Sequence, residues 1–149
     1  MIVAVGTDHA GFPLKEVCLA VIRSEGHEAL DCGAHSVLPE DDYPDYAELV
    51  ARAIVEKRAE RGVILCGSGV GASVAANKFV GIRGALCHDT FSARQGVEDD
   101  AMNVVCLGAR VIGPSLAAHV IEAFLRATFS GEERHRRRVA KIQEFERRL

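Results

Sequence analysis

The sequence predicts an α/β fold: a three-layer α/β/α, Rossmann-like sandwich built on a five-stranded parallel sheet. Five short apolar runs alternate with segments whose apolar residues recur at the helical period, which is the pattern of parallel strands joined by helices. The run Val63-Ile64-Leu65 contains no polar residue, as expected for a strand covered on both faces. The 149 residues contain no repeat and no linker, so we expect a single domain spanning 1–149.

The first half of the chain alternates strand and helix signals. The first helical pattern ends at Gly26, and Pro44, which suits the first turn of a helix, begins the next one. Residues 33–42 show neither period and are expected to form a loop. The expected elements are strands at 2–5, 28–32 and 63–65 and helices at 12–25 and 44–58. A further helix is expected after Gly71, where small residues continue at helical density.

The second half continues this alternation and ends in two helices. Gly113-Pro114 precedes the first of these helices, and Ser130-Gly131 separates it from the second. The expected elements are strands at 82–87 and 103–107 and helices at 89–96, 115–129 and 133–149. Because the last helix follows the last strand, the sheet pattern does not decide whether it reaches the cleft of its own chain or a neighbouring molecule.

The composition excludes several classes of protein. Of the residues, 48% are apolar and 26% are charged, which is typical of a globular protein. No apolar run approaches the roughly 18 residues of a membrane span, and the chain begins directly with a strand pattern. We therefore expect a cytoplasmic protein that does not bind membranes. The net charge of −3 argues against nucleic-acid binding, although basic residues at 134–138 suggest a local anion site.

The five cysteines form neither a metal-binding nor a disulfide pattern. Their number is odd and no CxxC pair is present, so we expect no metal and no disulfide scaffold. Cys18 falls on an apolar helical stripe, and Cys87 and Cys106 fall at or within strand patterns, so these three are expected to be core thiols. Cys66 differs because it ends an apolar run and precedes three glycines within five residues.

Cys66 and the loop Gly67-Ser68-Gly69-Val70-Gly71 are the first candidate for chemistry. Glycine lets the backbone approach a ligand or adopt a positive φ angle, and the start of a helix supplies unpaired N–H groups and a partial positive charge. Such a geometry holds an anion and favours the thiolate form of a neighbouring cysteine. A plain tight turn has the same glycines, so the motif by itself leaves both interpretations open.

A dinucleotide site is another interpretation of this loop. Gly67, Gly69 and Ala72 match GxGxxA, and Asp89 follows about twenty residues later. That motif normally follows the first strand of a larger domain, whereas this loop follows the third expected strand of a short chain. A small phosphorylated ligand is the better interpretation, because backbone N–H groups and the C-terminal arginines together suit a phosphate or an enediolate oxygen.

Polar segments in the expected loops indicate where a ligand would bind. The carboxyl ends of parallel strands lie at one edge of a sheet, and open α/β sheets bind ligands there. The polar segments are Asp8-His9, 66–71, His88-Asp89 and 99–103. We expect all four to lie near one another at this edge.

Separate motifs over nearly the whole chain share their order and spacing with a known family. They are Asp8-His9-Ala10-Gly11, Asp42-Tyr43-Pro44, 66–71 with Ala75-Ala76-Asn77-Lys78, Gly81-Ile82-Arg83, Met102-Asn103-Val104, 108–113, Arg134-His135 and Arg138-Val139. On these motifs the chain resembles the ribose-5-phosphate isomerase type B family, which also contains the galactose-6-phosphate isomerase subunits. The resemblance implies an aldose–ketose isomerase that acts through an enediolate, without metal or organic cofactor, on ribose 5-phosphate to give ribulose 5-phosphate.

The resemblance also implies a partner. In the family, the last residues of one subunit contribute to the site of the other, so we expect a homodimer or a dimer of dimers with shared active sites and a C-terminal helix that extends to the partner. Two alternatives stay open for the function. One is an isomerase of another C4 or C6 aldose phosphate, and the other is a sugar-phosphate-binding module without catalysis.

Carried over by position, the resemblance implies a role for each site residue. Cys66 resembles the base that takes the C2 proton, and Ser68 is implied to share a proton with the substrate oxygen. The implied binding residues are Gly67, Gly69, Val70 and Gly71, whose amides hold the enediolate oxygen, Asp8 and His9 at the sugar hydroxyls and ring oxygen, Asp100 at the substrate, and Arg110, Arg134, His135 and Arg138 at the phosphate or substrate.

One position departs from the family pattern. Asp99 stands where the family has the histidine that opens the sugar ring, and an aspartate of ordinary pKa, about 3.9, is ionised at pH 7 and is a poor proton donor. Three interpretations follow. Asp99 replaces the histidine in surroundings that keep it protonated, His9 or His88 opens the ring instead, or the substrate needs no ring opening, as for a four-carbon phosphate.

Overall fold

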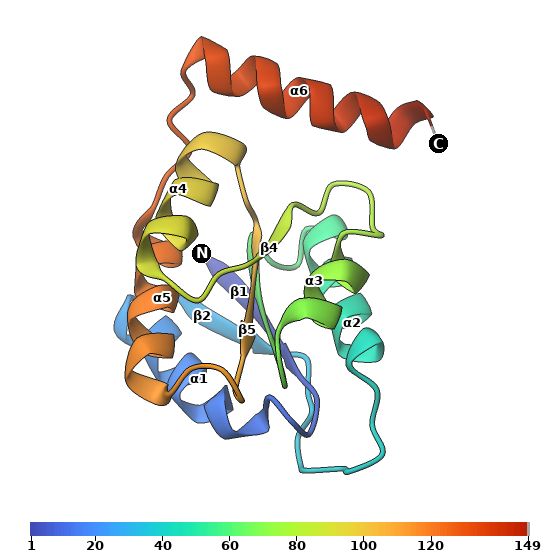
Figure 1. Cartoon of the computed structure of the whole chain (residues 1–149), viewed down its shortest axis with the longest axis vertical. Helices are drawn as coiled ribbons and strands as arrows, with labels where there is room; N and C mark the ends of the chain where they lie inside the picture. The colour runs from blue at the N-terminus through green and yellow to red at the C-terminus, as the bar shows by residue number, and fades with distance from the viewer. Residues whose placement is uncertain (149) are drawn as a thin grey trace.

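The computed structural model describes residues 1–148 and contains one five-stranded parallel sheet (Figure 1). The strands are β1 (Ile2–Thr7), β2 (Glu28–Asp31), β3 (Arg61–Cys66), β4 (Gly84–Leu86) and β5 (Val104–Gly108). Their order across the sheet is β2-β1-β3-β5-β4. After β1 the chain adds β2 on one side of it, and β3 then pairs with β1 on the other side. The point between β1 and β3 is therefore the topological switch point, and α/β sheets bind ligands at the carboxyl ends of the strands there.

Helices cover both faces of the sheet and confirm the predicted three layers. The chain forms a 3-10 turn η1 (Phe12–Leu14) and helices α1 (Lys15–Ser24), α2 (Tyr43–Val55), α3 (Val70–Ala76), α4 (Thr90–Asp100), α5 (Pro114–Arg126) and α6 (Glu133–Arg148). Helices α1, α4 and α5 lie on one face, and α2 and α3 lie on the other (Figure 1). Each face has its own buried cluster, with Ile22 and Phe124 in the first and Val50 and Ala72 in the second.

The apolar run before the glycine loop is buried on both sides of the sheet. Val63 and Leu65 belong to one cluster, and Ile64 and Cys66 belong to the other. Successive side chains of a strand point to opposite faces, so a central strand between two helical layers needs apolar residues at every position. The layers therefore explain the pattern, and they deliver Cys66 at the carboxyl end of β3.

The three cysteines expected in the core are buried free thiols, which confirms the prediction. Burial, with a smaller effect from the Asp31 carboxylate, raises the pKa of Cys18 to about 12. Burial likewise raises the pKa of Cys87 to about 11 and that of Cys106 further still. Because only the thiolate is a strong nucleophile or base, these three sulfurs are chemically inert at neutral pH.

Most elements differ from their predicted bounds by a few residues at one or both ends, and two of these differences lie beside predicted site residues. The fourth strand is only Gly84–Leu86, because the Arg83 N–H donates to the Asn103 side chain instead of joining the ladder. Helix α4 continues beyond the predicted 96 to Asp100, where Ala101 adopts a left-handed conformation (φ 51°) and its N–H bonds the Gly96 carbonyl. Because α4 joins two parallel strands, it runs from the carboxyl edge of the sheet to its amino edge.

Helix α6 lies across the amino edge of the sheet and is only partly packed on the rest of the chain (Figure 1). His135 and Val139 are buried, and the Gly81 N–H donates to the Glu146 carboxylate at 3.0 Å. Phe145 nevertheless leaves 58% of its surface exposed. In the part of the chain that the structure describes, neither this helix nor any other has the length and apolar character needed to cross a membrane.

Candidate active site

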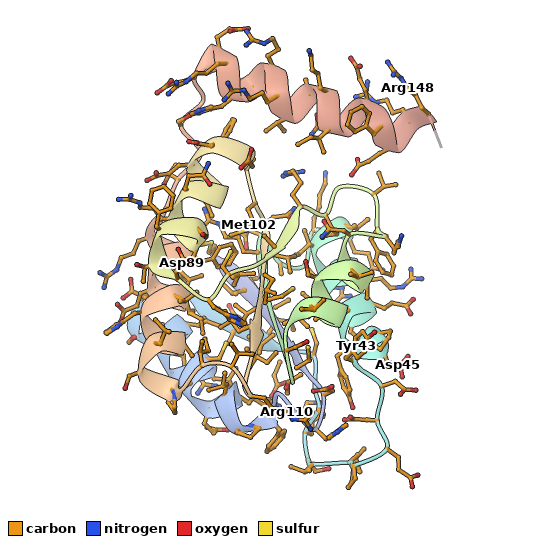
Figure 2. All side chains as sticks on the ribbon, viewed as in Figure 1. Tyr43, Asp45, Asp89, Met102, Arg110 and Arg148 are labelled. Atoms are coloured by element: carbon orange, nitrogen blue, oxygen red, sulfur yellow. The ribbon has the colours of Figure 1, made fainter. Side chains whose placement is uncertain are left out.

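A pocket of about 320 Å³ opens at the carboxyl edge of the sheet. It lies among the loops that follow β1, β3 and β5 and the first residue of α2. Its lining residues are Asp8, His9, Ala10, Tyr43, Cys66, Gly67, Ser68, Gly71, Arg110 and Val111. Figure 2 shows Tyr43 and Arg110 at this end of the molecule, opposite α6. The structure thus brings together the predicted residues that follow the first and third strands.

Cys66 lies at the floor of this pocket with only 3% of its surface exposed. Its Sγ accepts a hydrogen bond from the Gly69 N–H at 3.0 Å. Gly69 has a φ of +81°, and a Cβ there would lie 2.5 Å from Leu86 Cδ1, so only glycine fits both the backbone conformation and the space. The loop therefore aims a backbone donor at the sulfur, which stabilises a thiolate more than a thiol.

The other glycines of the loop allow two side chains to approach the backbone closely. A Cβ on Gly71 would lie 2.4 Å from the Tyr43 ring, and a Cβ on Gly67 would lie 3.3 Å from Arg110 Nη1. Arg110 is also anchored through its backbone, because its N–H donates to the Gly67 carbonyl at 3.0 Å. The guanidinium consequently supplies a positive charge beside the loop, where an anionic group of a ligand would be attracted.

Ser68 is exposed at the pocket wall, and its Oγ accepts the Val70 N–H at 3.2 Å. This bond leaves the hydroxyl proton free to be donated. Val70 begins α3, so its amide and that of Gly69 are committed to Ser68 and Cys66. The other loop residues, Gly67, Ser68 and Gly71, line the pocket.

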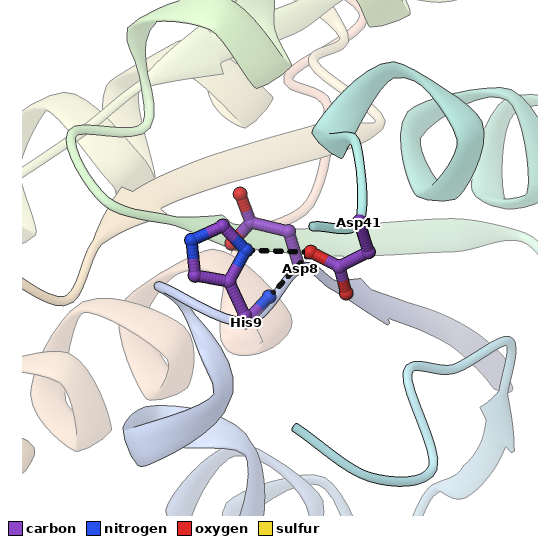
Figure 3. Close-up of side chains that lie close together, drawn as sticks. All are labelled: Asp8, His9 and Asp41. Atoms are coloured by element: carbon purple, nitrogen blue, oxygen red, sulfur yellow. Dashed lines mark hydrogen bonds and ion pairs between the residues drawn. The ribbon is translucent and has the colours of Figure 1, made fainter. Parts of the chain in front are cut away.

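On the opposite wall, Asp8 and His9 follow β1 directly. Asp8 is 5% exposed, and its Oδ1 accepts the Gly11 N–H at 2.9 Å. His9 bonds Asp41, a residue that the sequence offered no reason to select because it lies within the predicted loop at 33–42 (Figure 3). Asp41 therefore joins the site only through the folding of that loop over β1.

The Asp41 carboxylate accepts three hydrogen bonds. The His9 backbone N–H and ring Nδ1 lie 3.0 and 2.6 Å from Oδ1, and the Tyr46 hydroxyl lies 3.1 Å from Oδ2. Burial by itself raises the pKa of Asp41, but these hydrogen bonds outweigh burial and keep its pKa below the usual value. Burial and the nearby Asp41 charge raise the pKa of Tyr46, so it remains a proton donor.

Asp8, His9 and Asp41 are also the one group within residues 1–148 that could offer three ligand atoms to a cation. One atom from each lies within 4.8 Å of the others. In the structure, however, His9 Nδ1 and Asp41 Oδ1 bond each other, and Asp8 Oδ1 bonds Gly11. These three side chains therefore form hydrogen bonds within the protein, and their arrangement is that of a hydrogen-bond network and not of a metal site.

A second group of predicted site residues lies at the amino edge. It consists of Asp99, Asp100, Arg134, His135 and Arg138, at the end of α4 and on the first half of α6. His135 is buried, with its Nε2 3.5 Å from Asp99 Oδ1 and its Nδ1 2.6 Å from Ser130 Oγ. Arg134 and Arg138 are both exposed; Arg134 pairs with Glu132 at 2.9 Å, and Arg138 forms no ion pair within the described residues.

The prediction that 99–103 lies beside Cys66 is wrong within one chain. The Gly62 N–H donates to the Asn103 carbonyl at 2.8 Å, so Asn103 lies beside the start of β3. Cys66 is four residues further along that strand, which is about 13 Å at roughly 3.3 Å per residue. The segment precedes β5 instead of following a strand, and the long α4 carries it to the amino edge.

The fourth predicted segment, His88-Asp89, does lie at the carboxyl edge. His88 Nε2 accepts the Gly108 N–H at 2.9 Å, and Gly108 is the register partner of Cys66. Asp89 caps α4, because its Oδ1 accepts the Ser92 N–H at 2.6 Å. Neither side chain lines the pocket, so both have structural roles at the strand ends.

The chain is similar to known proteins over nearly its whole length. The profile of the family described as Ribose/Galactose Isomerase matches residues 3–142. Ribose-5-phosphate isomerase B of Escherichia coli (strain K12) is 40% identical over 98% of this chain and 97% of its own length. D-erythrulose-4-phosphate isomerase of Pectobacterium atrosepticum is also 40% identical, over 87% of this chain and 85% of its own. The structure of type B ribose 5-phosphate isomerase from Trypanosoma cruzi superimposes with a TM-score of 0.96, 40% identity and full coverage of both chains.

Proposed function

The chain belongs to the ribose/galactose isomerase family, and we propose that it is an aldose–ketose isomerase that converts ribose 5-phosphate to ribulose 5-phosphate. The observation that carries this proposal is the position of Cys66, buried at the floor of the pocket with a backbone N–H aimed at its sulfur. A relative of similar length that is 40% identical is named ribose-5-phosphate isomerase B. The five cysteines are all free, which suits the reducing cytoplasm where we place the reaction.

Cys66 is the base in this proposal. Its thiolate takes the proton from C2 of the open-chain aldose, and the electron pair of that C–H bond forms the C1=C2 double bond while the carbonyl electrons move to O1. The amides of Gly67 and Gly71 and the charge of Arg110 stabilise the enediolate oxygen that results. Cys66 then returns the proton to C1, where the electron pair of the C1=C2 bond forms the new C–H bond. The O2–H electrons form the C2=O2 carbonyl, and Ser68 passes the proton that leaves O2 to the O1 oxyanion. No electron or atom is supplied from outside, so these steps require no cofactor.

A homodimer or dimer of dimers with shared sites accounts for the second group of residues. One chain cannot use Arg134 and Arg138 at its own pocket, because the two groups lie at opposite edges of the sheet. We propose that the partner subunit supplies them, with Asp99, Asp100 and His135 beside them, and that the arginines bind the phosphate. Exposed apolar side chains at α3 and α6, Val70, Val74 and Phe145 among them, mark surfaces that such an assembly would cover.

A four-carbon aldose phosphate is the second candidate substrate. Asp99 replaces the ring-opening histidine of the family pattern, and a relative that is 40% identical is named D-erythrulose-4-phosphate isomerase. An aldotetrose 4-phosphate cannot close a five-membered ring, because the phosphate occupies its C4 oxygen. An enzyme for such a substrate needs no group that opens a ring.

Turnover and hydrogen exchange together test the proposal. The purified protein is assayed with C4, C5 and C6 aldose phosphates, and the loss of deuterium from C2-labelled substrate into water is followed by NMR. We expect ribose 5-phosphate to be converted with kcat/KM at least about tenfold above the other sugars, and with C2 exchange. Preference for erythrose 4-phosphate would replace the substrate assignment, and binding of sugar phosphates without exchange would show a module without catalysis.

A further inference from the structure

We propose that Asp41 is a positioning residue that holds the His9 imidazole so that its Nε2 transfers the proton that opens the sugar ring. This inference rests on the proposed function, because only a cyclic sugar phosphate needs the step. It assigns a role to a residue outside every recognised motif of the chain and gives ring opening a proton carrier at the same pocket as Cys66.

The hydrogen bonds of Asp41 define the orientation of His9. Both carboxylate oxygens are used: Oδ1 accepts from the backbone and ring of His9 (Figure 3), and Oδ2 accepts from the Tyr46 hydroxyl. An ionised carboxylate only accepts hydrogen bonds, so the proton between Asp41 and His9 is on Nδ1. With the proton on Nδ1, the neutral form of the ring has an unprotonated Nε2 on the side turned away from Asp41 (Figure 3).

The location of His9 allows that nitrogen to reach a substrate. His9 lines the pocket with Cys66 and Arg110, and 32% of its side chain is exposed, whereas 8% of the Asp41 side chain is. The carboxylate is thus shielded behind the ring that it holds. Asp41 does not line the pocket, so its effect on substrate is exerted through His9.

Ring opening at this site is a proton transfer that returns His9 to its starting state. Nε2 takes the proton from the anomeric hydroxyl, and the O–H electrons form the C1=O1 carbonyl as the bond from C1 to the ring oxygen breaks. The ring oxygen keeps that electron pair and receives the proton from Nε2. Between the two transfers the imidazole is a cation, which the Asp41 carboxylate at 2.6 Å stabilises.

The other two candidates for this step are engaged elsewhere. Asp99 accepts a hydrogen bond from Gln95 at 2.8 Å and lies 3.5 Å from the buried His135, so both oxygens of its carboxylate are already engaged within its own chain. His88 lies at the carboxyl edge, but its Nε2 accepts the Gly108 N–H and its side chain does not line the pocket. Of these three side chains, only His9 combines exposure to the pocket with a carboxylate behind it.

The test separates ring opening from the later steps. Ribulose 5-phosphate has no free hydroxyl that can close a five-membered ring, so exchange of its C1 hydrogen with solvent needs Cys66 but no ring opening. We expect Asp41→Asn to lower kcat for ribose 5-phosphate about 30-fold or more and to leave C1 exchange of ribulose 5-phosphate within about twofold of wild type. Glu40→Gln is the matched control, since the neighbouring Glu40 carboxylate is exposed and makes no hydrogen bond within residues 1–148; it should change neither rate.

A second measurement does not depend on turnover. In nitrogen-15 spectra of the histidine rings, assigned with a His9→Asn variant, His9 of the wild type should be the Nδ1–H tautomer, and Asp41→Asn should shift its population toward Nε2–H. An Nε2–H tautomer in the wild type would overturn the proposal.

The remaining outcomes are also decisive. Equal loss of both reactions in Asp41→Asn would show a general structural role and overturn the proposal, as would no loss in either. Inactivation by a chelator that metal restores would make Asp41 a metal ligand instead. If the wild type does not convert ribose 5-phosphate at all, the proposed function itself is contradicted. That result differs from an active wild type whose Asp41→Asn variant loses both reactions, which contradicts only the role of Asp41.

Discussion

At the carboxyl edge of the sheet, Cys66 and Asp8 are buried and each is hydrogen-bonded to a backbone N–H three residues further along its own loop. At the amino edge, Arg134 and Arg138 are exposed on a helix that is only partly packed on its own chain. The first group forms a lined pocket within one chain. The second group consists of charges that face no pocket residue of that chain.

This difference suits two separate roles, proton transfer at the carboxyl edge and phosphate binding by residues of the amino edge. Proton abstraction needs a base and an oxyanion site held to within fractions of an ångström, which short loops at strand ends provide. Phosphate binding tolerates long, flexible cations, because most of its attraction is electrostatic and less directional. One chain can therefore hold the catalytic Cys66 in a rigid pocket and, in the proposed assembly, supply Arg134 and Arg138 to the pocket of its partner.

The largest effect should come from the carboxyl edge. We expect Cys66→Ala to lower kcat for ribose 5-phosphate by about a thousandfold or more, because it removes the base, while substrate binding and thermal unfolding change little. Cys32→Ala is the control, since Cys32 is also a free thiol but is half-buried and does not line the pocket. Near-normal turnover by the Cys66 variant would contradict the proposed base.

The sharing of sites between subunits predicts a rescue. Cys66→Ala and Arg138→Ala subunits should each be nearly inactive alone and should regain about a quarter of wild-type activity when mixed and allowed to exchange, because half of the dimers are mixed and each has one intact site of two. The measurement is turnover before and after exchange at equal total protein. If mixing restores nothing although mass spectrometry detects mixed dimers, the sites are self-contained.

A smaller effect is expected at Asp99. If ring opening takes place at the carboxyl edge, Asp99→His should leave turnover of ribose 5-phosphate equal to or up to about tenfold above that of wild type, since it adds a second proton carrier. Steady-state kinetics with ribose 5-phosphate checks this. A large loss would show instead that Asp99 is the working acid, and the two edges would then share the proton chemistry.

The smallest effect concerns the thiols that lie away from the pocket. Burial raises the pKa of Cys18 from about 9 in the unfolded chain to about 12 in the folded chain. Below pH 9 the thiol is neutral in both states, and its contribution to the free energy of unfolding is fully present. That contribution is lost as the pH rises from 9 to 12, because only the unfolded chain ionises readily in this range. At pH 10 the loss is about 1 kcal/mol. Denaturant unfolding at pH 8 and pH 10 should show a smaller decrease for Cys18→Ala than for wild type, and an equal decrease would contradict the assignment.

Much of this molecule follows from local patterns in the sequence. The order of strands and helices, the burial of Val63 to Leu65 and the glycine loop after Cys66 are consequences of periodicity and of glycine's freedom at positive φ, both of which are properties of neighbouring residues. The pairing of Asp8 with Cys66 across the pocket also follows, because parallel strands end at one edge.

The tertiary structure decided the placement of two other features. Asp99 precedes β5 and therefore lies at the amino edge, but only the packing of α6 against α4 brings it to the buried His135. Asp41 meets His9 only because a loop of irregular residues folds back over β1. In both cases the deciding interactions join residues that are distant along the chain or lack a repeating pattern, and the free energy of such contacts depends on the packing of the whole fold.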